Sequence, residues 1–291
     1  MSRLNDFGGL FRLDSKVAVI TGGSRGIGLH TATAFLQAGA ERVILVARKL
    51  EGPQGLLSAL GALHSTVPGC RGRVSTIACD LSKFSEVQRL AKEIEAITCE
   101  VHILVANAGA TWGGPLETTP DASISKVLDL NVRSIINLAR LLAPLLIRTG
   151  IPQDPARIII IGAIAGFTVP FTGENSTIVY SVSKAAAHHL ARNLAMEYGP
   201  QNVTCNCVAP GFFPTKLSNG LIDIFERTKM KVWLALRLAA TISKPLLIEL
   251  DWLSFAGLSL AGALGSQPKL QDWIYGPQIP DYQSSEMSQA T

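Results

Sequence analysis

The sequence has little charge, few aromatic side chains and no cysteine pattern. Of its 291 residues, 16% are charged and 6% are aromatic. The formal net charge of +4 is not gathered in a basic block, which argues against a nucleic-acid partner. Its five cysteines follow neither metal-ligand nor disulfide spacing, and their odd number favours reduced thiols in an intracellular protein.

Long apolar runs are also missing. Residues 1–15 lack the apolar stretch that a secretory signal needs, and no run of 18 or more apolar residues is free of charge. We therefore expect no signal peptide and no integral membrane segment, and we predict a cytoplasmic protein. The length is compatible with one large α/β domain.

Short β-branched runs alternate with helical patterns over the first three quarters of the chain. The runs are nearly continuous in apolar residues, as in strands buried on both faces of a parallel sheet. This alternation predicts an α/β, Rossmann-type doubly wound parallel sheet, with ligands at the carboxyl ends of its strands. The predicted strands are Val17–Ile20, Val43–Ala47, Val74–Ala78, Ile103–Ala106, Arg157–Ile161 and Val203–Val208, and the predicted helices span 27–38, 84–97, 122–148 and 179–198.

A glycine-rich loop, Gly22-Gly23-Ser24-Arg25-Gly26-Ile27-Gly28, follows the first predicted strand and opens a helix. This is the context that a dinucleotide fingerprint requires, because glycines let the backbone approach a pyrophosphate while the helix N-terminus offers free amides. The same spacing also occurs in plain tight turns. We predict a cofactor site at Gly22, Ser24, Arg25, Gly26 and Gly28.

The end of the second predicted strand distinguishes between the two nicotinamide cofactors. An acidic residue there binds the adenosine ribose, but the sequence reads Ala47-Arg48-Lys49. Arg48 and Arg25 are suited to pair with a 2′-phosphate, which predicts NADP(H), although both are also consistent with solvated surface arginines. Asp80 and Asn107 follow the third and fourth strands, where we expect them beside the adenine and the cofactor.

Tyr180 and Lys184 lie four residues apart in a predicted helix, and therefore on one face. An ammonium beside a phenol favours the ionised phenol, so we expect the pKa of Tyr180 to fall below about 10. A tyrosine that exchanges protons, next to a nicotinamide site, predicts hydride transfer coupled to proton transfer on a carbonyl or alcohol.

Taken together, these motifs resemble the short-chain dehydrogenase/reductase family, most of all its 3-oxoacyl-reductase-like members. The likeness spans roughly residues 10 to 217, and Pro210-Gly211 is the last motif within it. It implies that Tyr180 is the general acid/base, that Lys184 lowers its pKa and binds the nicotinamide ribose, and that Asn131 holds a relay water. For Asn131, the alternative is a polar residue on a solvated helix face. The likeness further implies cofactor contacts for Ile27, Arg140, Phe213 and Thr215.

The first departure from the family is Ala163, which stands where the resemblance implies a serine that polarises the carbonyl. Thr168, Thr172, Ser176 or Thr177 are the local hydroxyls available to replace it, and the sequence selects none of them. Losing one such donor typically costs about 10²–10³ in rate. A slower reductase, or one that uses a hydroxyl of its own substrate, is therefore compatible with Ala163.

The second departure is the C-terminus, where we find helical apolar sequence and no seventh strand. We predict one domain whose residues 1–216 form the NADP-binding Rossmann part and whose residues 217–291 form a divergent helical region. Residues 225–242 in that region suit a substrate lid best, with a membrane-surface helix or an interface as alternatives. A mispredicted exon is a further alternative explanation for the divergent sequence of this region.

Other conspicuous residues favour packing over chemistry. Adjacent histidines at 188 and 189 point about 100° apart on a helix, which does not suit a shared metal ion. Cys205 and Cys207 alternate within a strand and favour core packing over a redox or metal role.

The hypothesis that follows is an NADPH-dependent reductase of a ketone, or a related unsaturated group, in an apolar small molecule. The family likeness suggests a place in secondary metabolism. The alternative is a cofactor-binding pseudoenzyme or a non-redox pocket protein. Retained Tyr180, Lys184 and Asn131 favour the first, while Ala163 and the altered C-terminus favour the second. The sequence leaves open whether the chain forms a homo-oligomer.

Overall fold

A six-stranded sheet forms the centre of the protein. The computed structural model describes residues 11–70, 72–211, 213 and 215. Every pairing in the sheet is parallel, and the strand order is β3-β2-β1-β4-β5-β6. The predicted doubly wound fold is therefore confirmed. The strands are β1 Val17–Thr21, β2 Arg42–Ala47, β3 Val74–Ala78, β4 Ile103–Ala106, β5 Ala156–Ile161 and β6 Val203–Val208.

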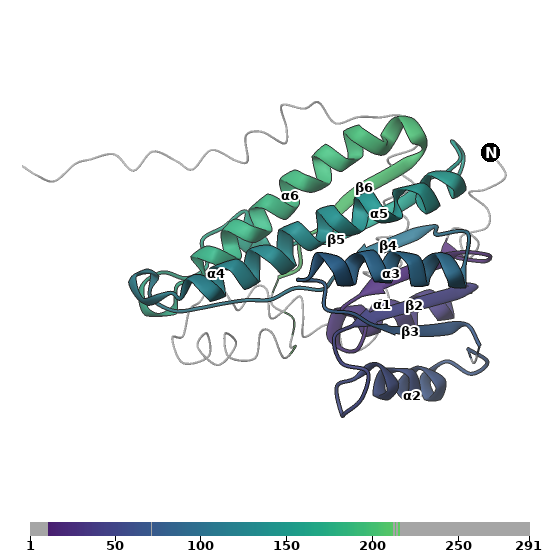
Figure 1. The fold of residues 1–291 in the computed structure, drawn as a ribbon, viewed down its shortest axis with the longest axis horizontal. Helices are drawn as coiled ribbons and strands as arrows, with labels where there is room; N and C mark the ends of the chain where they lie inside the picture. Colours follow the sequence, from purple (N-terminus) through teal and green to yellow (C-terminus); the bar gives the residue numbers. More distant parts are fainter. Residues whose placement is uncertain (1–10, 71, 212, 214, 216–291) are drawn as a thin grey trace, which may run out of the picture.

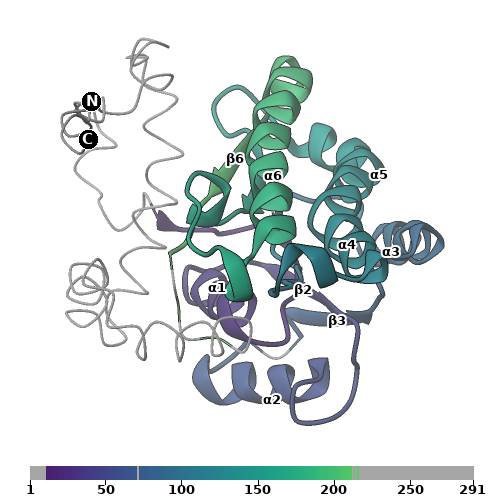
Figure 2. The same ribbon diagram turned by 90° about the vertical axis from the view of Figure 1, so that its left-hand side faces the viewer.

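Helices cover both faces of this sheet (Figures 1 and 2). Side chains of α1 and α2 pack on one face, around Phe35, Leu36 and Leu63, and side chains of α3, α5 and α6 pack on the other, around Leu90 and Leu142. The strands are buried on both sides because βαβ crossovers place helices on each face. The helices are α1 Gly26–Gln37, α2 Leu56–Thr66, α3 Phe84–Ile97, α4 Asp121–Leu128, α5 Ser134–Thr149 and α6 Ile178–Tyr198.

Two helix predictions need correction. The helix α2 was not predicted: Gly52, Pro53 and Gly55 precede it and Gly61 interrupts it, so turn signals mask its apolar period. The helix predicted over 122–148 is present as one helical stretch, Asp121–Thr149, but a π-helical turn that was not predicted, η4 Asp129–Arg133, lies between its α-helical parts α4 and α5. Such turns are rare and often occur at functional sites.

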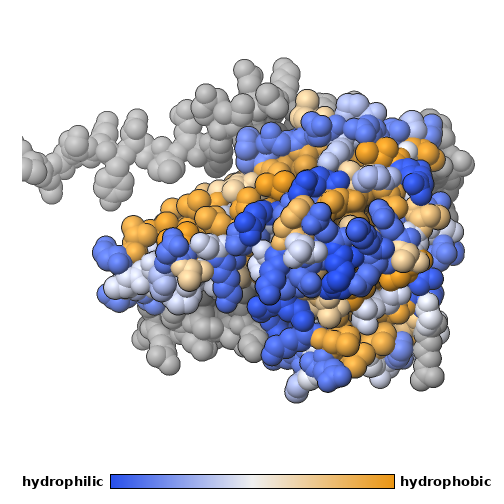
Figure 3. Space-filling model, viewed as in Figure 1, coloured by the Kyte–Doolittle hydropathy of each residue, from blue (hydrophilic) through white to orange (hydrophobic). Residues whose placement is uncertain are grey.

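The surface reflects the amphipathic character of the outer helices (Figure 3). Polar side chains cover α3, whose Val87, Leu90 and Ile94 face the core, while apolar side chains emerge along α6. Within the described residues, the stretch Asp121–Thr149 is long and apolar enough to cross a membrane by length and composition alone. However, 56% of its most apolar window is buried inside the protein, as in a core helix.

The predictions for residues 217–291, including the lid helix and the absence of a seventh strand, lie outside the described residues. The division of the chain at residue 216 therefore stays a prediction. Within the described part, β1 and β4 are neighbours at the point where the strand order reverses, so their carboxyl ends frame the crevice in which this fold binds ligands.

Candidate active site

The glycine loop lies at this crevice, and its backbone is packed too closely for a Cβ at Gly22, Gly23 or Gly28. Gly22 has a φ of +65°, and a Cβ on Gly28 would lie 2.4 Å from the carbonyl oxygen of Gly22. The loop leads into α1, whose N-terminal amides and dipole favour an anion. Ser24 and Ile27 are half-buried in the same turn, and Thr215 lies over it, since a Cβ on Gly26 would lie 3.4 Å from the Thr215 methyl carbon.

Asn107 holds this loop against the end of β4. Its Nδ2 donates to the carbonyl oxygens of Thr21 at 2.9 Å and Gly22 at 3.2 Å. The buried Thr21 hydroxyl accepts the backbone N–H groups of Asn107 and Ala108, both at 3.0 Å. The Asn107 side-chain amide therefore stabilises the conformation of the glycine loop. Thr21 was not among the predicted site residues. The signal that could have identified it is its position directly before the glycine loop, at the end of the first strand.

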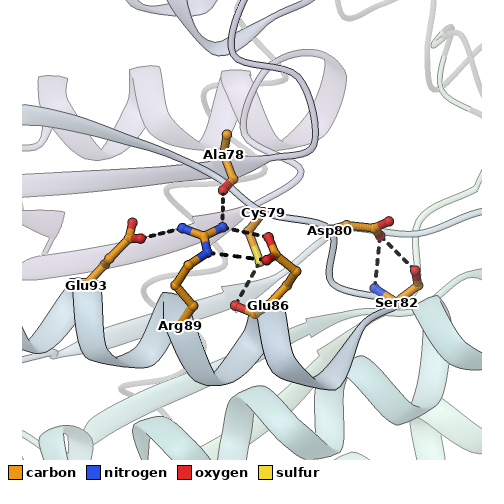
Figure 4. A network of polar contacts seen from close by, with 7 residues as sticks. All are labelled: Ala78, Cys79, Asp80, Ser82, Glu86, Arg89 and Glu93. Atoms are coloured by element: carbon orange, nitrogen blue, oxygen red, sulfur yellow. Dashed lines mark hydrogen bonds and ion pairs between the residues drawn. The ribbon is translucent and has the colours of Figure 1, made fainter.

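The basic residues predicted for the 2′-phosphate lie at the adjacent strand ends. Arg48 is exposed after β2, and Arg25 is exposed with its guanidinium donating to Gln54 at 2.8 Å. Asp80 follows β3, where its Oδ1 accepts the backbone N–H and the hydroxyl of Ser82 (Figure 4). Burial acts to raise the pKa of Asp80, but the bonds from Ser82 and nearby positive charges, including Arg48, outweigh it and lower the pKa.

An ion-pair network fixes the strand end that carries Asp80 (Figure 4). Arg89 on α3 donates to the carbonyl oxygen of Ala78 at 2.7 Å and to Glu86 at 2.7 Å, and it also pairs with Glu93. The guanidinium thus ties α3 to the last residue of β3. We assign this network a structural role in placing Asp80.

Asn131 is fully buried inside the π-helical turn. Its Oδ1 accepts the backbone N–H of Ala110 at 2.8 Å, and its Nδ2 donates to the carbonyl oxygen of Ala110 and to the Ser183 hydroxyl, both at 2.9 Å. Ser183 in turn donates to the backbone carbonyl of Tyr180 at 2.7 Å. The alternative of a solvated helix face for Asn131 is therefore wrong, and Ser183 joins it to the helix that carries Tyr180.

Tyr180 and Lys184 lie together in the first two turns of α6, with the Lys184 Nζ 5.7 Å from the centre of the Tyr180 ring. The Nζ donates to the carbonyl oxygen of Ile161, at the end of β5, at 2.7 Å. A Cβ on Gly109 would lie 3.1 Å from the Asn131 Oδ1 and 3.8 Å from this Nζ. Asn131, Lys184 and the loop after β4 thus converge on one place.

The expected fall in the pKa of Tyr180 is not observed. Burial raises the pKa of Tyr180 to about 12. Burial also lowers the pKa of Lys184 to about 8, with a smaller opposing effect of Cys207. Desolvation penalises the charged form of both side chains, and Lys184 is not among the causes of the Tyr180 shift, so the attraction on which the expectation rested does not decide the pKa.

Position 163 holds a buried alanine at the start of the turn after β5. Of the four hydroxyls predicted as replacements, that of Thr168 donates to Ile164 and that of Thr177 lies 3.5 Å from the Ser181 hydroxyl. Thr172 is exposed. Ser176 is buried, and its hydroxyl has no hydrogen-bond partner in the described structure.

Two predicted cofactor residues lie apart from this convergence. Arg140 donates to Asn137 at 3.0 Å and stacks over the Phe84 ring at 4.7 Å, between α5 and α3. Phe213 is exposed. The packing predicted for the cysteine pair agrees with the structure, since Cys205 is buried and Cys207 half-buried, and burial raises the pKa of Cys205 to about 12.

Comparison with known proteins points to one family. The family model for short chain dehydrogenase matches residues 16–223. A "Rhamnolipids biosynthesis 3-oxoacyl-[acyl-carrier-protein] reductase" of Pseudomonas aeruginosa is 38% identical over 213 residues, which cover 73% of this chain and 78% of that protein. A 7alpha-hydroxysteroid dehydrogenase of Escherichia coli is 32% identical over 222 residues, covering 75% and 79%.

The solved structures agree. The Pseudomonas aeruginosa RhlG/NADP active-site complex superposes with a TM-score of 0.70 at 33% identity, covering 88% of this chain and 94% of that one. A short-chain type dehydrogenase/reductase from Mycobacterium marinum has a TM-score of 0.66 at 28% identity, covering 75% and 80%. The chain therefore belongs to the short-chain dehydrogenase/reductase family and is an oxidoreductase of that type.

Proposed function

We propose that the protein is an NADPH-dependent oxidoreductase that reduces a ketone, or a related unsaturated group, in an apolar small molecule. The observation that carries the proposal is the placement of the half-buried Tyr180 beside the buried Lys184, next to Asn131 and the loop after β4. In this assignment Tyr180 gives the proton, and Lys184 and Asn131 support it. The place of the protein in secondary metabolism stays a prediction from family likeness.

The residues around the crevice fit a dinucleotide with a 2′-phosphate. The loop has no room for a Cβ at Gly22, Gly23 or Gly28, and it leads into the N-terminus of α1, where helix amides and the helix dipole favour a pyrophosphate. Arg25 and Arg48 are exposed beside it, and the residues directly after β2, Arg48 and Lys49, include no acid to take the ribose hydroxyl. A relative with this fold was solved with NADP, which agrees with this choice.

At neutral pH both side chains hold the protonation states from which a ketone reduction starts. With a pKa of about 12, the Tyr180 phenol carries its proton, as a donor must, but it is a weaker acid than a free phenol, so its proton transfer depends on stabilisation of the phenolate. With a pKa of about 8, Lys184 is mostly an ammonium at pH 7, and its charge stabilises the phenolate left behind. Bound NADPH supplies the hydride that the carbonyl carbon accepts.

The surface near Tyr180 supports an apolar substrate. The loops on either side of the tyrosine expose large apolar side chains, which is unusual unless they meet a ligand or a partner. The exposed apolar residues of these loops are Trp112, Leu116, Phe167, Val169 and Ile178.

A second function, a cofactor-binding protein without redox turnover, is favoured by Ala163. In the described structure, the hydroxyls of Thr168 and Thr177 are engaged elsewhere, and the Ser176 hydroxyl is sealed from solvent. Ala163→Ser separates the two functions. If a hydroxyl is all that the site lacks, this variant should gain about 10²–10³ in rate. If the protein is a reductase and Ala163→Ser does not accelerate it, another group already donates the hydrogen bond that polarises the substrate carbonyl.

The test of the proposal is NADPH consumption by the purified protein against a panel of 3-oxoacyl thioesters and aromatic ketones. Tyr180→Phe should lower turnover by about 10²–10⁴ while the dissociation constant of NADPH stays nearly unchanged. Equal turnover by the wild type and Tyr180→Phe rules out the tyrosine as the acid. Tight NADPH binding with no turnover on any substrate favours the second function.

A further inference from the structure

His188 is buried where α6 crosses the end of β5. Only 5% of the residue is exposed, and its ring fills the space above two glycines. A Cβ on Gly162 would lie 2.4 Å from the His188 Nε2, and a Cβ on Gly166 would lie 2.5 Å from its Cε1. The ring also stacks on Phe167, with centroids 4.1 Å apart and planes inclined by 28°. The turn from Gly162 to Phe167 is therefore shaped around this imidazole.

One hydrogen bond orients the ring. The backbone N–H of Ala163 donates to the His188 Nε2 at 3.4 Å, so Nε2 is the acceptor and the neutral ring carries its proton on Nδ1. That Nδ1 is buried and has no partner within the described residues. A buried donor without a partner costs about 1–3 kcal/mol, so the packing of the ring must offset this cost.

The bond at Ala163 is the second of a matched pair. Lys184, one helical turn earlier on the same face, donates through Nζ to the carbonyl oxygen of Ile161 at 2.7 Å. Residues four apart on α6 thus bind residues two apart at the end of β5. Two attachments fix the rotation of α6 relative to the strand end, which one attachment alone does not.

We propose that His188 is a positioning residue of the reductase: as a neutral imidazole, it holds the turn Gly162–Phe167 against α6 and thereby fixes Lys184 and Tyr180 relative to the end of β5. This role rests on the proposed function, because it concerns the placement of that function's acid. His188 acts through other residues, since its ring lies behind the turn and its contacts are with Ala163 and Phe167.

Burial, and after it the charges around the ring, lower the pKa of His188 and favour the neutral imidazole. Lys184 and Arg192, both on α6, are the cations that act in this direction. From β6, Cys207 approaches the same space, since its Sγ would lie 2.7 Å from a Cβ on Gly162. The segment of β5 and its turn from Ile161 to Phe167 brings no titratable group. The acceptor at Nε2 is therefore retained at neutral pH.

The test compares three variants of the full chain. His188→Gln keeps an acceptor at the position of Nε2, His188→Phe keeps an aromatic ring without an acceptor, and His189→Phe changes the exposed neighbour as a control. We expect His188→Phe to lower kcat by about 10- to 100-fold, as small misplacements of catalytic groups do, with NADPH affinity unchanged. His188→Gln and His189→Phe should stay within about threefold of the wild type.

A second readout does not depend on activity. NMR titration of ¹³C-labelled lysine, with Lys184 assigned through Lys184→Arg, should show the pKa of Lys184 rising from about 8 towards 10.5 in His188→Phe, and not in His189→Phe. If His188→Phe does not fold, His188→Asn takes its place, because its shorter side chain also leaves Ala163 without an acceptor.

The outcomes separate this inference from the proposed function. An unchanged kcat and an unchanged Lys184 titration in His188→Phe overturn the positioning role. So does an equal loss in His188→Gln and His188→Phe, which indicates packing alone. If the wild type shows no turnover on any substrate, the proposed function fails, while the Lys184 titration still decides whether His188 positions the lysine.

Discussion

Two turns in this protein use glycine for opposite reasons. Both follow the carboxyl end of a parallel strand, and neither has room for a Cβ at its critical positions. After β1, what blocks a Cβ on Gly28 is mainly backbone, the carbonyl oxygen of Gly22 at 2.4 Å. After β5, what blocks a Cβ on Gly162 is the His188 ring and the Cys207 sulfur. A glycine pattern thus predicts a close approach without saying what approaches.

The largest effect is expected at the first turn. Gly28→Ala forces the Cβ against backbone that cannot move without opening the loop, so we expect about 3 kcal/mol of destabilisation and the loss of NADPH binding. Removing the Asn107 side chain in addition should not relieve the clash, because the Gly22 carbonyl remains. Chemical denaturation and NADPH titration measure both effects. Relief in the Gly28→Ala/Asn107→Ala double variant contradicts the distinction between the two turns.

At the second turn the clash should be relievable. Gly162→Ala is expected to cost about 2 kcal/mol, because the new methyl group meets side-chain atoms of His188 and Cys207. In a His188→Ala background the same substitution should cost at least about 0.5 kcal/mol less. A double-mutant cycle of unfolding free energies gives this coupling. Strict additivity shows that the histidine ring is not what requires glycine at position 162.

A glycine with no close neighbour provides the matched control. A Cβ on Gly61, inside α2, meets nothing within 4 Å. Gly61→Ala should therefore stabilise the protein by about 0.5–1 kcal/mol, because alanine loses less backbone entropy on folding and favours the helix. Thermal unfolding measures this gain. A loss of stability at Gly61 means that the spaces around the other two glycines do not explain their effects.

The smallest effect is a difference in acid stability. Burial first, and then the charges of Lys184 and Arg192, lower the pKa of His188 below its usual 6.5. The unfolded chain protonates His188 more readily than the folded chain does. The contribution of the neutral ring to the free energy of unfolding is therefore fully present above about pH 6.5 and is lost as the pH falls below that value. His188→Gln should therefore lose less stability between pH 7 and pH 5 than the wild type does.

The matched variant for this measurement is His102→Gln. The pKa of His102 is also lowered, chiefly by burial and then by Lys16, so His102→Gln should likewise lose less stability than the wild type as the pH falls below about 6.5. Thermal midpoints across the pH range test both. An acid profile of His188→Gln that coincides with the wild type shows that His188 does not stay neutral in the fold.

Much of the fold was readable from the sequence because it depends on local patterns. Every predicted strand is present to within one residue at each end, since runs buried on both faces stand out from their surroundings. The helix α2 was missed because turn residues surround it. The π-helical turn within the helix over 122–148 was missed because such a turn leaves no apolar signal of its own.

The identity of the main site residues could be predicted from the sequence, but their pKa values could not. The sequence identified Tyr180, Lys184, Asn131 and the glycine loop, which the fold brings to one edge of the sheet. It gave the wrong direction for the pKa of Tyr180, because burial depends on residues distant in sequence. The prediction that His188 packs in the fold is confirmed by its burial, whereas its neighbour His189 is exposed. The bond from Ala163 to His188 was not predicted, because the two residues lie 25 apart in the sequence.

The most direct test of the central claim is the fate of the hydride. Purified protein is incubated with a ketone and NADPH deuterated at C4, separately in each stereochemical position, and the product is examined by mass spectrometry. We predict an alcohol with one deuterium on the carbinol carbon from one of the two labelled cofactors, and almost no product from Tyr180→Phe. An unlabelled product, or equal product from Tyr180→Phe, contradicts hydride transfer with Tyr180 as the acid.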